Sequence, residues 1–262
     1  MKIKNSKLKL GLFIPDAHSE PEHDNKRFEA LGKLIYDIRP DFVVEIGDFT
    51  DFASLCKYDT NKKVEFNNRR YAKDCEHSLD AQDKLWWQYR KNKKAFPLRV
   101  KHIGNHEHRG NKVVEANPVL LEGKLNITKD LDLYYNWDIV VPYDGDHPGY
   151  MFLNDILFAH YVTNGNTSNA TAGINPATIL LNTTYMSTVV AHSHLYDICI
   201  KTRADGKKMV GLVGGWFGDY KPSYVGAGYN RWTSGITLMK NVDNGYYEPD
   251  FIATETIKKE YR

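Results

Sequence analysis

The stretch LKLGLFIPDAH, residues 8–18, decides the fold class, because a short apolar run stops abruptly at a proline followed by polar side chains. The apolar part is typical of a buried strand, and the proline ends it. Apolar residues then recur at helical spacing from Phe28 to Ile38, and residues 42–46 form a second apolar run. A strand, a helix and a strand in this order predict a β-α-β unit in a parallel, buried sheet.

The rest of the chain predicts one α/β domain over residues 1–262. Residues 53–97 are polar, aromatic and basic, and we expect them to form a helical insertion packed beside the core, with one long helix over about 70–94. The second half is richer in β structure. It predicts hairpins at 150–159, around 205–206 and around 243–245, a helix over 176–185, and strands over 98–103 and 188–191. We expect two stacked sheets with helices outside.

Composition excludes several classes of protein. The hydrophobic fraction of 42% and charged fraction of 26% are those of an ordinary globular protein, and a net charge of +2 indicates no general preference for nucleic acid or anionic membranes. The apolar N-terminal run is too short for a signal peptide, and no run is long enough to span a membrane. The three cysteines have no metal-ligand spacing. These features favour a reduced, cytoplasmic protein without a membrane partner.

Polar side chains that can bind metals follow five of the predicted strands. They are Asp16 and His18, Asp48, Asn105, His160, and His192 with His194. The carboxyl ends of strands in α/β sheets converge on one crevice, so we expect these side chains to lie together. In Asp-x-His and His-x-His, an extended backbone would point both side chains to the same side. Each pair would then either bind one metal ion or give one ligand to each of two ions.

The donor types indicate which metals to expect. Carboxylate, imidazole and amide oxygen without thiolate suit manganese, iron or zinc better than a structural cysteine-zinc site. Each piece alone is weak, since Gly47-Asp48 is an ordinary turn signal and a lone His160 is more often a buried histidine. Five such pieces at strand ends in one order are far more specific, and together they predict a metal site.

In this order the pieces resemble the motifs of the calcineurin-like metallophosphoesterase superfamily: Asp-x-His, Gly-Asp-x-x-Asp, Gly-Asn-His-Glu, His and His-x-His. The matching positions are Asp16/His18, Gly47/Asp48/Asp51, residues 104–107, His160 and His192/His194. They span about two thirds of the chain. Residues 51–71, 104–109 and 191–215 also resemble small phosphoesterases of bacteriophage and prophage genomes, for which the location would be the host cytoplasm.

The resemblance implies a four-layer α/β/β/α sandwich with two divalent metal ions. Manganese is expected, with iron, zinc or nickel as alternatives. By analogy with the family, one ion is held by Asp16, His18 and His194, and the other by Asn105, His160 and His192. Asp48 would bridge the two ions and take part in catalysis.

Two metal ions held by these seven residues lead us to expect phosphoester hydrolysis. Two ions lower the pKa of bound water from about 15.7 toward about 7, so that a metal-bridging hydroxide is available. The resemblance makes His106 a proton or hydrogen-bond donor to the phosphate and not a ligand. His108 and Arg109 follow in what we predict to be the same loop, and we expect both to contact the substrate. Arg109 would clamp phosphate or be an ordinary surface arginine.

The substrate stays open. Protein phosphatases of the family have Gly before the first Asp and an Arg after the Gly-Asp motif; Pro15 and residues 49–53 depart from this, which disfavours that activity. Residues 53–101 hold 13 Lys and Arg against six Asp and Glu, interleaved with aromatics, as in a single-stranded nucleic-acid groove. The alternative is a solvated helix whose aromatic face packs on the core. The Trp216–Trp232 stretch would line the pocket or fill a sheet edge.

Three functions remain. The leading one is a phosphodiesterase acting on nucleic acid or nucleotides. The second is a phosphomonoesterase acting on a small metabolite or a phosphorylated end, which needs a closed pocket with a dianion clamp such as Arg109. The third is a binding module without catalysis, against which the intact ligand set argues. The oligomeric state is left open.

Overall fold

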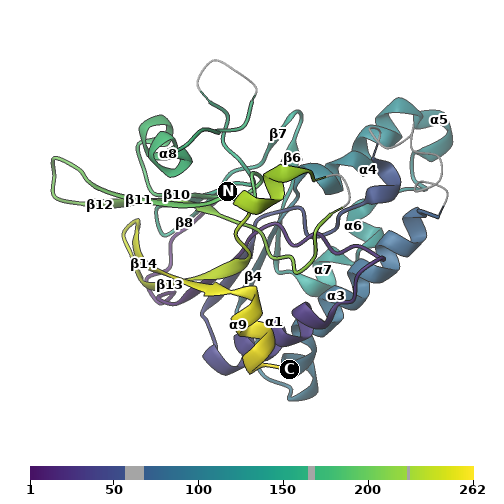
Figure 1. The fold of residues 1–262 in the computed structure, drawn as a ribbon, viewed down its shortest axis with the longest axis horizontal. Helices are drawn as coiled ribbons and strands as arrows, with labels where there is room; N and C mark the ends of the chain where they lie inside the picture. The colour runs from purple at the N-terminus through teal and green to yellow at the C-terminus, as the bar shows by residue number, and fades with distance from the viewer. Residues whose placement is uncertain (57–67, 165–168, 223–224) are drawn as a thin grey trace.

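The computed structural model describes residues 1–56, 68–164, 169–222 and 225–262. These residues form one α/β domain with two six-stranded sheets of mixed parallel and antiparallel strands (Figure 1). The predicted α/β class and the β-α-β unit are both confirmed, since β2 and β3 are parallel neighbours joined through α1.

The first sheet has the order β14-β13-β2-β3-β4-β5. Its strands are β2 (Gly11–Ile14), β3 (Phe42–Glu45), β4 (Leu98–His102), β5 (Ile139–Val141), β13 (Gly235–Asp243) and β14 (Tyr246–Ala253). Strands β2 to β5 are parallel, whereas β13 pairs antiparallel with β2 and with β14. The parallel strands are therefore aligned so that their carboxyl ends meet at one edge.

The second sheet has the order β1-β8-β9-β10-β12-β11. Its strands are β1 (Lys2–Ile3), β8 (Met151–Leu153), β9 (Ile156–Phe158), β10 (Thr188–Val190), β12 (Lys208–Gly214) and β11 (Tyr196–Thr202). A separate ribbon pairs β6 (Tyr143–Asp144) with β7 (His147–Pro148). All three predicted hairpins are present, as β8–β9, β11–β12 and β13–β14.

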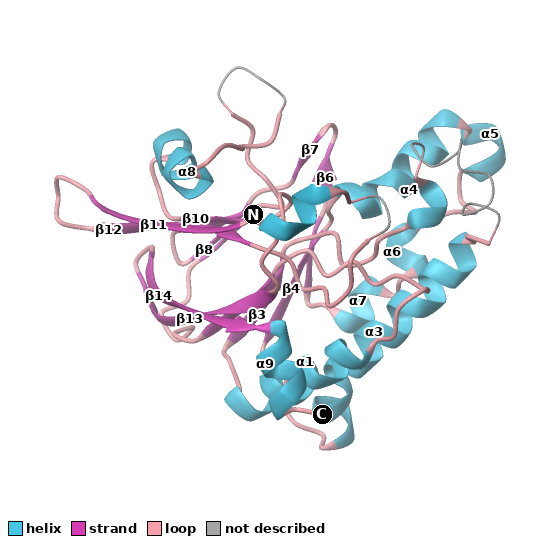
Figure 2. Cartoon of the chain, in the orientation of Figure 1, coloured by secondary structure: helices cyan, strands magenta, loops and turns pink. Residues whose placement is uncertain are grey.

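Apolar side chains from both sheets meet in one buried cluster. Phe13 and Val44 come from the first sheet, and Phe158 and Leu212 come from the second. The outer faces are covered by helices, as Figures 1 and 2 show: α8 lies beyond the second sheet, and α1 and α9 lie beyond the first. The α-helices are α1 (Lys26–Ile38), α3 (Tyr71–Lys91), α4 (Asn105–Ala116), α5 (Pro118–Leu121), α6 (Ile127–Asp130), α7 (Leu133–Asn136), α8 (Pro176–Thr184) and α9 (Thr254–Glu260).

The described part of the basic segment 53–97 consists mainly of α3, preceded by the short helix η1 (Ala53–Leu55). Helix α3 packs against α1, and its Trp86 and Tyr89 are buried in the same cluster as the apolar face of α1. Trp87 points outward and is 52% exposed. Residues 57–67, with Tyr58 and Phe66 of the predicted nucleic-acid groove, lie outside the described residues. In the part that is described, most aromatic side chains thus fill the core.

The residues after β4 differ from our prediction. We expected His108 and Arg109 to lie in a loop, but they belong to the first turns of α4. Gly104 precedes this helix, and the Glu107 carboxylate accepts a hydrogen bond of 3.0 Å from the Gly104 backbone N–H. An acidic residue three positions after a capping residue is a known helix-start signal, and it was present in the sequence. Among the described residues, there is no helix both long and apolar enough to cross a bilayer.

Candidate metal centre

All seven predicted ligands lie where the two sheets meet. Asp16, Asp48 and Asn105 follow β2, β3 and β4 of the first sheet, while His160 and His192 follow β9 and β10 of the second. His18 and His194 stand two residues beyond Asp16 and His192. The structure brings these residues into two neighbouring groups that can hold metal ions.

The first group consists of Asp16, His18 and His194. His194 Nε2 lies 3.0 Å from Asp16 Oδ2, and the Nε2 atoms of His18 and His194 are 3.1 Å apart. All three side chains are buried. Three donor atoms therefore face one small volume that is shielded from solvent.

The second group consists of Asp48, His160 and His192, with the amide oxygen of Asn105 beside them. His160 Nε2 lies 3.3 Å from Asp48 Oδ2, 2.8 Å from Asn105 Oδ1 and 3.2 Å from His192 Nδ1. A further grouping joins Asp48 with His18 and His106, so Asp48 adjoins both groups. This partition of ligands is the one that the family resemblance implies.

The backbone at these ligands is not extended, contrary to our expectation. His18, Asp48, His192 and His194 have φ angles of 43°, 56°, 65° and 60°. Left-handed conformations are uncommon for residues other than glycine and cluster at functional sites. The left-handed turns send the two histidines of the His-x-His pair to different groups, so this pair straddles both, whereas Asp16 and His18 stay in one.

Hydrogen bonds fix which ring nitrogen of two histidines faces each group. His160 Nδ1 donates to the carbonyl of Ile46 at 3.1 Å, and His18 Nδ1 lies 2.7 Å from Asp51 Oδ1. In both rings Nε2 therefore faces the donor groups. Histidines that bind metals almost always have such an outer partner. Asp51 belongs to the Gly-Asp-x-x-Asp motif, but its orienting role was missing from our predicted site.

The buried charges favour a cation at this place. Burial and the Asp48 carboxylate raise the pKa of Asp16 to about 6. Burial lowers the pKa of His194 to about 3 and that of His192 to about 4, so both rings stay neutral, which is the form that binds metals. Burial opposes charge on His160 too, but the Asp48 and Asp16 carboxylates outweigh it and raise its pKa to about 9. A divalent ion at this place would be stabilised by the same two carboxylates.

A buried network holds the loop that carries Asp48. Glu107, which is fully buried, accepts hydrogen bonds from the backbone N–H groups of Asp48 at 2.9 Å and Thr50 at 3.1 Å. Lys101 lies 3.0 Å from Glu107 and 2.6 Å from Glu45, again with both groups buried. This buried network was not predicted from the sequence. The sequence did contain a sign of this network: one charged residue lies inside each of two strands that were predicted to be fully buried.

Arg27 of α1 holds the other ligand loop. Its side chain is buried, and Nη2 donates to the carbonyls of Ala17 at 2.9 Å and His18 at 3.1 Å. Nε donates to the carbonyl of Phe217 at 3.1 Å, and Tyr220 Oη donates to the same His18 carbonyl at 2.8 Å. The guanidinium thus ties the left-handed turn at His18 to the segment after β12. The sequence offered little sign of this role, because an arginine on an amphipathic helix is ordinary.

His106 and Arg109 lie at the edge of the two groups. His106 Nδ1 donates to the carbonyl of Asp51 at 2.7 Å, and Arg109 Nη2 lies 3.0 Å from His106 Nε2. Burial lowers the pKa of His106, but the Asp48 and Asp51 carboxylates outweigh this effect and raise it. Both residues can therefore meet an anion at the metal groups. The His108 ring stacks on Tyr143, with ring centroids 4.2 Å apart.

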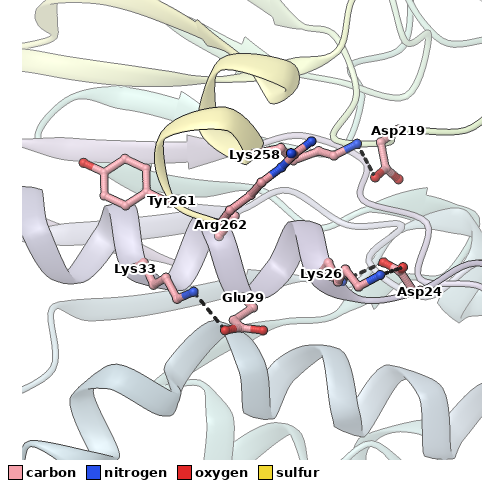
Figure 3. A pocket seen from close by; sticks show the side chains of 9 residues that line it. Asp24, Lys26, Glu29, Lys33, Asp219, Lys258, Tyr261 and Arg262 are labelled. Atoms are coloured by element: carbon pink, nitrogen blue, oxygen red, sulfur yellow. Dashed lines mark hydrogen bonds and ion pairs between the residues drawn. The ribbon is translucent and has the colours of Figure 1, made fainter.

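A cavity of about 400 Å³ lies between α1 and α9, apart from the metal groups (Figure 3). Figure 3 shows three of its lysines, each beside a carboxylate of the same cavity. Lys26 lies 2.8 Å from Asp24, Lys33 lies 2.9 Å from Glu29, and Lys258 lies 3.0 Å from Asp219. Each of these lysine charges is thus balanced by a carboxylate within the cavity.

Comparisons with known proteins add no family. No family model matches the chain, and no curated protein matches it. Among solved structures, the chain is similar to the crystal structure of the protein TT1561 of Thermus thermophilus. That alignment has 9% sequence identity and a TM-score of 0.34, and it covers 93% of this chain and 99% of the other.

Proposed function

We propose that this chain is a two-metal-dependent phosphodiesterase that acts on nucleic acid or nucleotides. The observation that carries the proposal is the pair of buried donor groups on either side of Asp48. Two ions sharing one carboxylate are the usual arrangement for in-line displacement at phosphorus. The helix–sheet–sheet–helix layering supports assigning the fold to the four-layer sandwich of calcineurin-like phosphoesterases.

The residues present fit two divalent ions. Both carboxylate oxygens of Asp16 are buried and form no hydrogen bond with any residue that the structure describes, although His194 Nε2 lies 3.0 Å from Oδ2. Buried polar atoms are seldom left without a partner, so these two oxygens support an ion as the partner. The donors are carboxylate, imidazole and amide, which suit manganese, iron, zinc or nickel. Asp16, His18 and His194 would hold one ion, Asn105, His160 and His192 the other, and Asp48 both.

When bound, the ions supply charge that activates water and neutralises the phosphate oxygens. The protein's own side chains do the rest. Asp51 orients His18 and His106 through their Nδ1 atoms, so that Nε2 of each ring faces inward. Arg109 Nη2 lies 3.0 Å from His106 Nε2, and its guanidinium can turn from this nitrogen onto a phosphate oxygen. Once that contact is released, His106 Nε2 would carry a proton and give it to the leaving oxygen.

The test is hydrolysis of two chromogenic esters by purified protein with Mn²⁺. We expect bis-p-nitrophenyl phosphate, a diester, to be hydrolysed faster than p-nitrophenyl phosphate, a monoester. Asp48→Asn should lose most of the turnover, because Asp48 adjoins both groups. Asp205→Asn, in an exposed turn far along the chain, is the matched control and should keep wild-type rates.

The possible results separate the three functions. A faster monoester reaction would replace the diesterase with a phosphomonoesterase. Metal uptake without turnover of either ester would leave a binding module. Equal rates for Asp48→Asn and the wild type would remove this site from the reaction altogether.

A further inference from the structure

Four aromatic side chains surround one edge of the metal centre. Trp216, Tyr220, Tyr229 and Trp232 come from the segment between β12 and β13, and we call them the aromatic cluster. Trp216 is buried at 1% exposure, whereas Trp232 and Tyr229 are half-buried. The rings of Trp216 and Trp232 lie edge to face, with centroids 5.0 Å apart, and Tyr229 lies 5.5 Å from Trp232.

Trp232 is packed directly on a predicted ligand. Its ring centroid lies 4.0 Å from that of His194, with the two planes at 87°. The backbone after it is fixed as well, because Thr233 N donates to the His194 carbonyl at 3.2 Å and Trp216 N donates to the Thr233 carbonyl at 3.0 Å. The indole therefore has a settled position beside the place where a phosphoester would bind. Little conformational entropy would be lost when a second ring stacks on it.

Core packing does not account for this arrangement. Trp216 fills the interior, but Trp232 and Tyr229 keep exposed surface. Lys221 Nζ lies 5.8 Å from the centroid of the Tyr229 ring, and Arg231 is exposed. Aromatic rings beside positive charges, next to a phosphate-directed site, are what nucleotide binding requires. In the described part of the basic segment 53–101, by contrast, Trp86 and Tyr89 are buried.

We propose that Trp232, supported by Tyr229, stacks on the nucleobase adjoining the scissile phosphate and so makes the enzyme selective for nucleotide diesters. The inference rests on the proposed phosphodiesterase function and names its substrate class. Stacking is tolerant of sequence, because every base has a π face. The same residues thus predict a preference for nucleotides over other diesters without a strong preference among bases.

The test compares two diesters that differ by one base. They are the dinucleotide thymidylyl-thymidine and its counterpart with one base replaced by hydrogen, both assayed with the Mn²⁺-loaded protein. We expect wild-type kcat/KM to favour the full dinucleotide by roughly 5- to 100-fold, the worth of one base–aromatic stack. Trp232→Leu, which is apolar without a π face, should abolish this ratio, and Trp232→Phe should keep most of it. Trp87→Ala on α3 removes an exposed tryptophan elsewhere and should keep the ratio.

Each result bears on one claim. A wild-type ratio near one, or an equal loss of both reactions in Trp232→Leu, would show that Trp232 only packs on His194. Loss of the ratio in Trp87→Ala would move base recognition to the α3 segment. If neither diester is hydrolysed, the phosphodiesterase fails, and calorimetric binding of the same two compounds decides the stacking site alone. Tighter binding of the full dinucleotide that depends on Trp232 would keep the site, and equal binding would remove it.

Discussion

At the scale of single residues, the clustering of the candidate ligands could be predicted and their backbone conformations could not. The motif spacing selected seven side chains that the structure brings together, because donor types at strand ends are visible in the sequence. The left-handed turns at His18, Asp48, His192 and His194 are not visible there, since Asp and His adopt positive φ more often than most residues but still do so in a small minority of cases. They are imposed by long-range contacts such as the bonds from Arg27 to the carbonyls of Ala17 and His18.

Gly104 provides the first prediction at this scale. A Cβ at this position would lie 2.1 Å from Asp48 Oδ1 and 2.3 Å from Asp48 N, so Gly104→Ala must displace the shared carboxylate. We expect the free energy of unfolding to fall by about 1–3 kcal/mol, as for other overpacked sites. We also expect weaker Mn²⁺ binding. Urea unfolding and titration calorimetry measure the two effects.

Gly228→Ala is the matched control for that change. A Cβ at Gly228 meets no atom of the described residues within 4 Å, so both quantities should stay at their wild-type values. Wild-type Mn²⁺ affinity in Gly104→Ala would mean that Asp48 does not need its observed position to bind metal.

At the scale of elements, β2, β3 and β4 were predicted from their apolar runs, whereas β5 was not, and the charges within β3 and β4 were not understood. Glu45 of β3 and Lys101 of β4 are register partners in the sheet, and both side chains are buried with Glu107. Helix α4 was missed for a related reason. Its start depends on the Glu107 carboxylate capping Gly104, and we read that segment as part of a catalytic loop.

Glu45 makes the stability of this element depend on pH. Burial, assisted by the Glu107 carboxylate, raises the pKa of Glu45 from 4.5 to about 8 although Lys101 opposes the shift. Between these pH values the folded protein binds more protons than the unfolded chain, so stability falls as the pH rises through this window. Glu45→Gln cannot ionise, so its loss of stability between pH 5 and pH 8.5 should be smaller by about 1–3 kcal/mol.

Urea unfolding of metal-free protein at the two pH values measures this difference. Glu260→Gln removes an exposed carboxylate of α9 and should keep the wild-type dependence. Identical pH dependence in Glu45→Gln and the wild type would show that Glu45 is ionised in the folded protein throughout the window.

At the scale of the whole molecule, the metal centre joins the two sheets. Each donor group takes residues from both, since Asp16 and Asp48 follow strands of the first sheet and His194 and His160 follow the second. The sequence predicted two sheets with helices outside. It could not predict pairings such as β1 with β8 and β2 with β13, because these join residues far apart in the chain. Those pairings are fixed by packing of the shared core.

Because the donors come from both sheets, Mn²⁺ should bind the folded protein and not the unfolded chain. At a concentration 100 times the dissociation constant, such binding adds about 2.7 kcal/mol, or roughly 5–10 °C in melting temperature. Asp16→Asn should show a much smaller shift, because it loses a ligand.

Without metal, Asp16→Asn should melt at a higher temperature than the wild type at pH 8. Burial raises the pKa of Asp16 to about 6, so its ionised form destabilises the fold, and the neutral amide removes that penalty. Thermal melting curves with chelator and with Mn²⁺ test both expected differences in melting temperature. Asp205→Asn, an exposed change, should melt like the wild type under each condition. A metal-free Asp16→Asn protein that melts well below the wild type would mean that Asp16 stabilises the fold by itself and is not held in place for a cation.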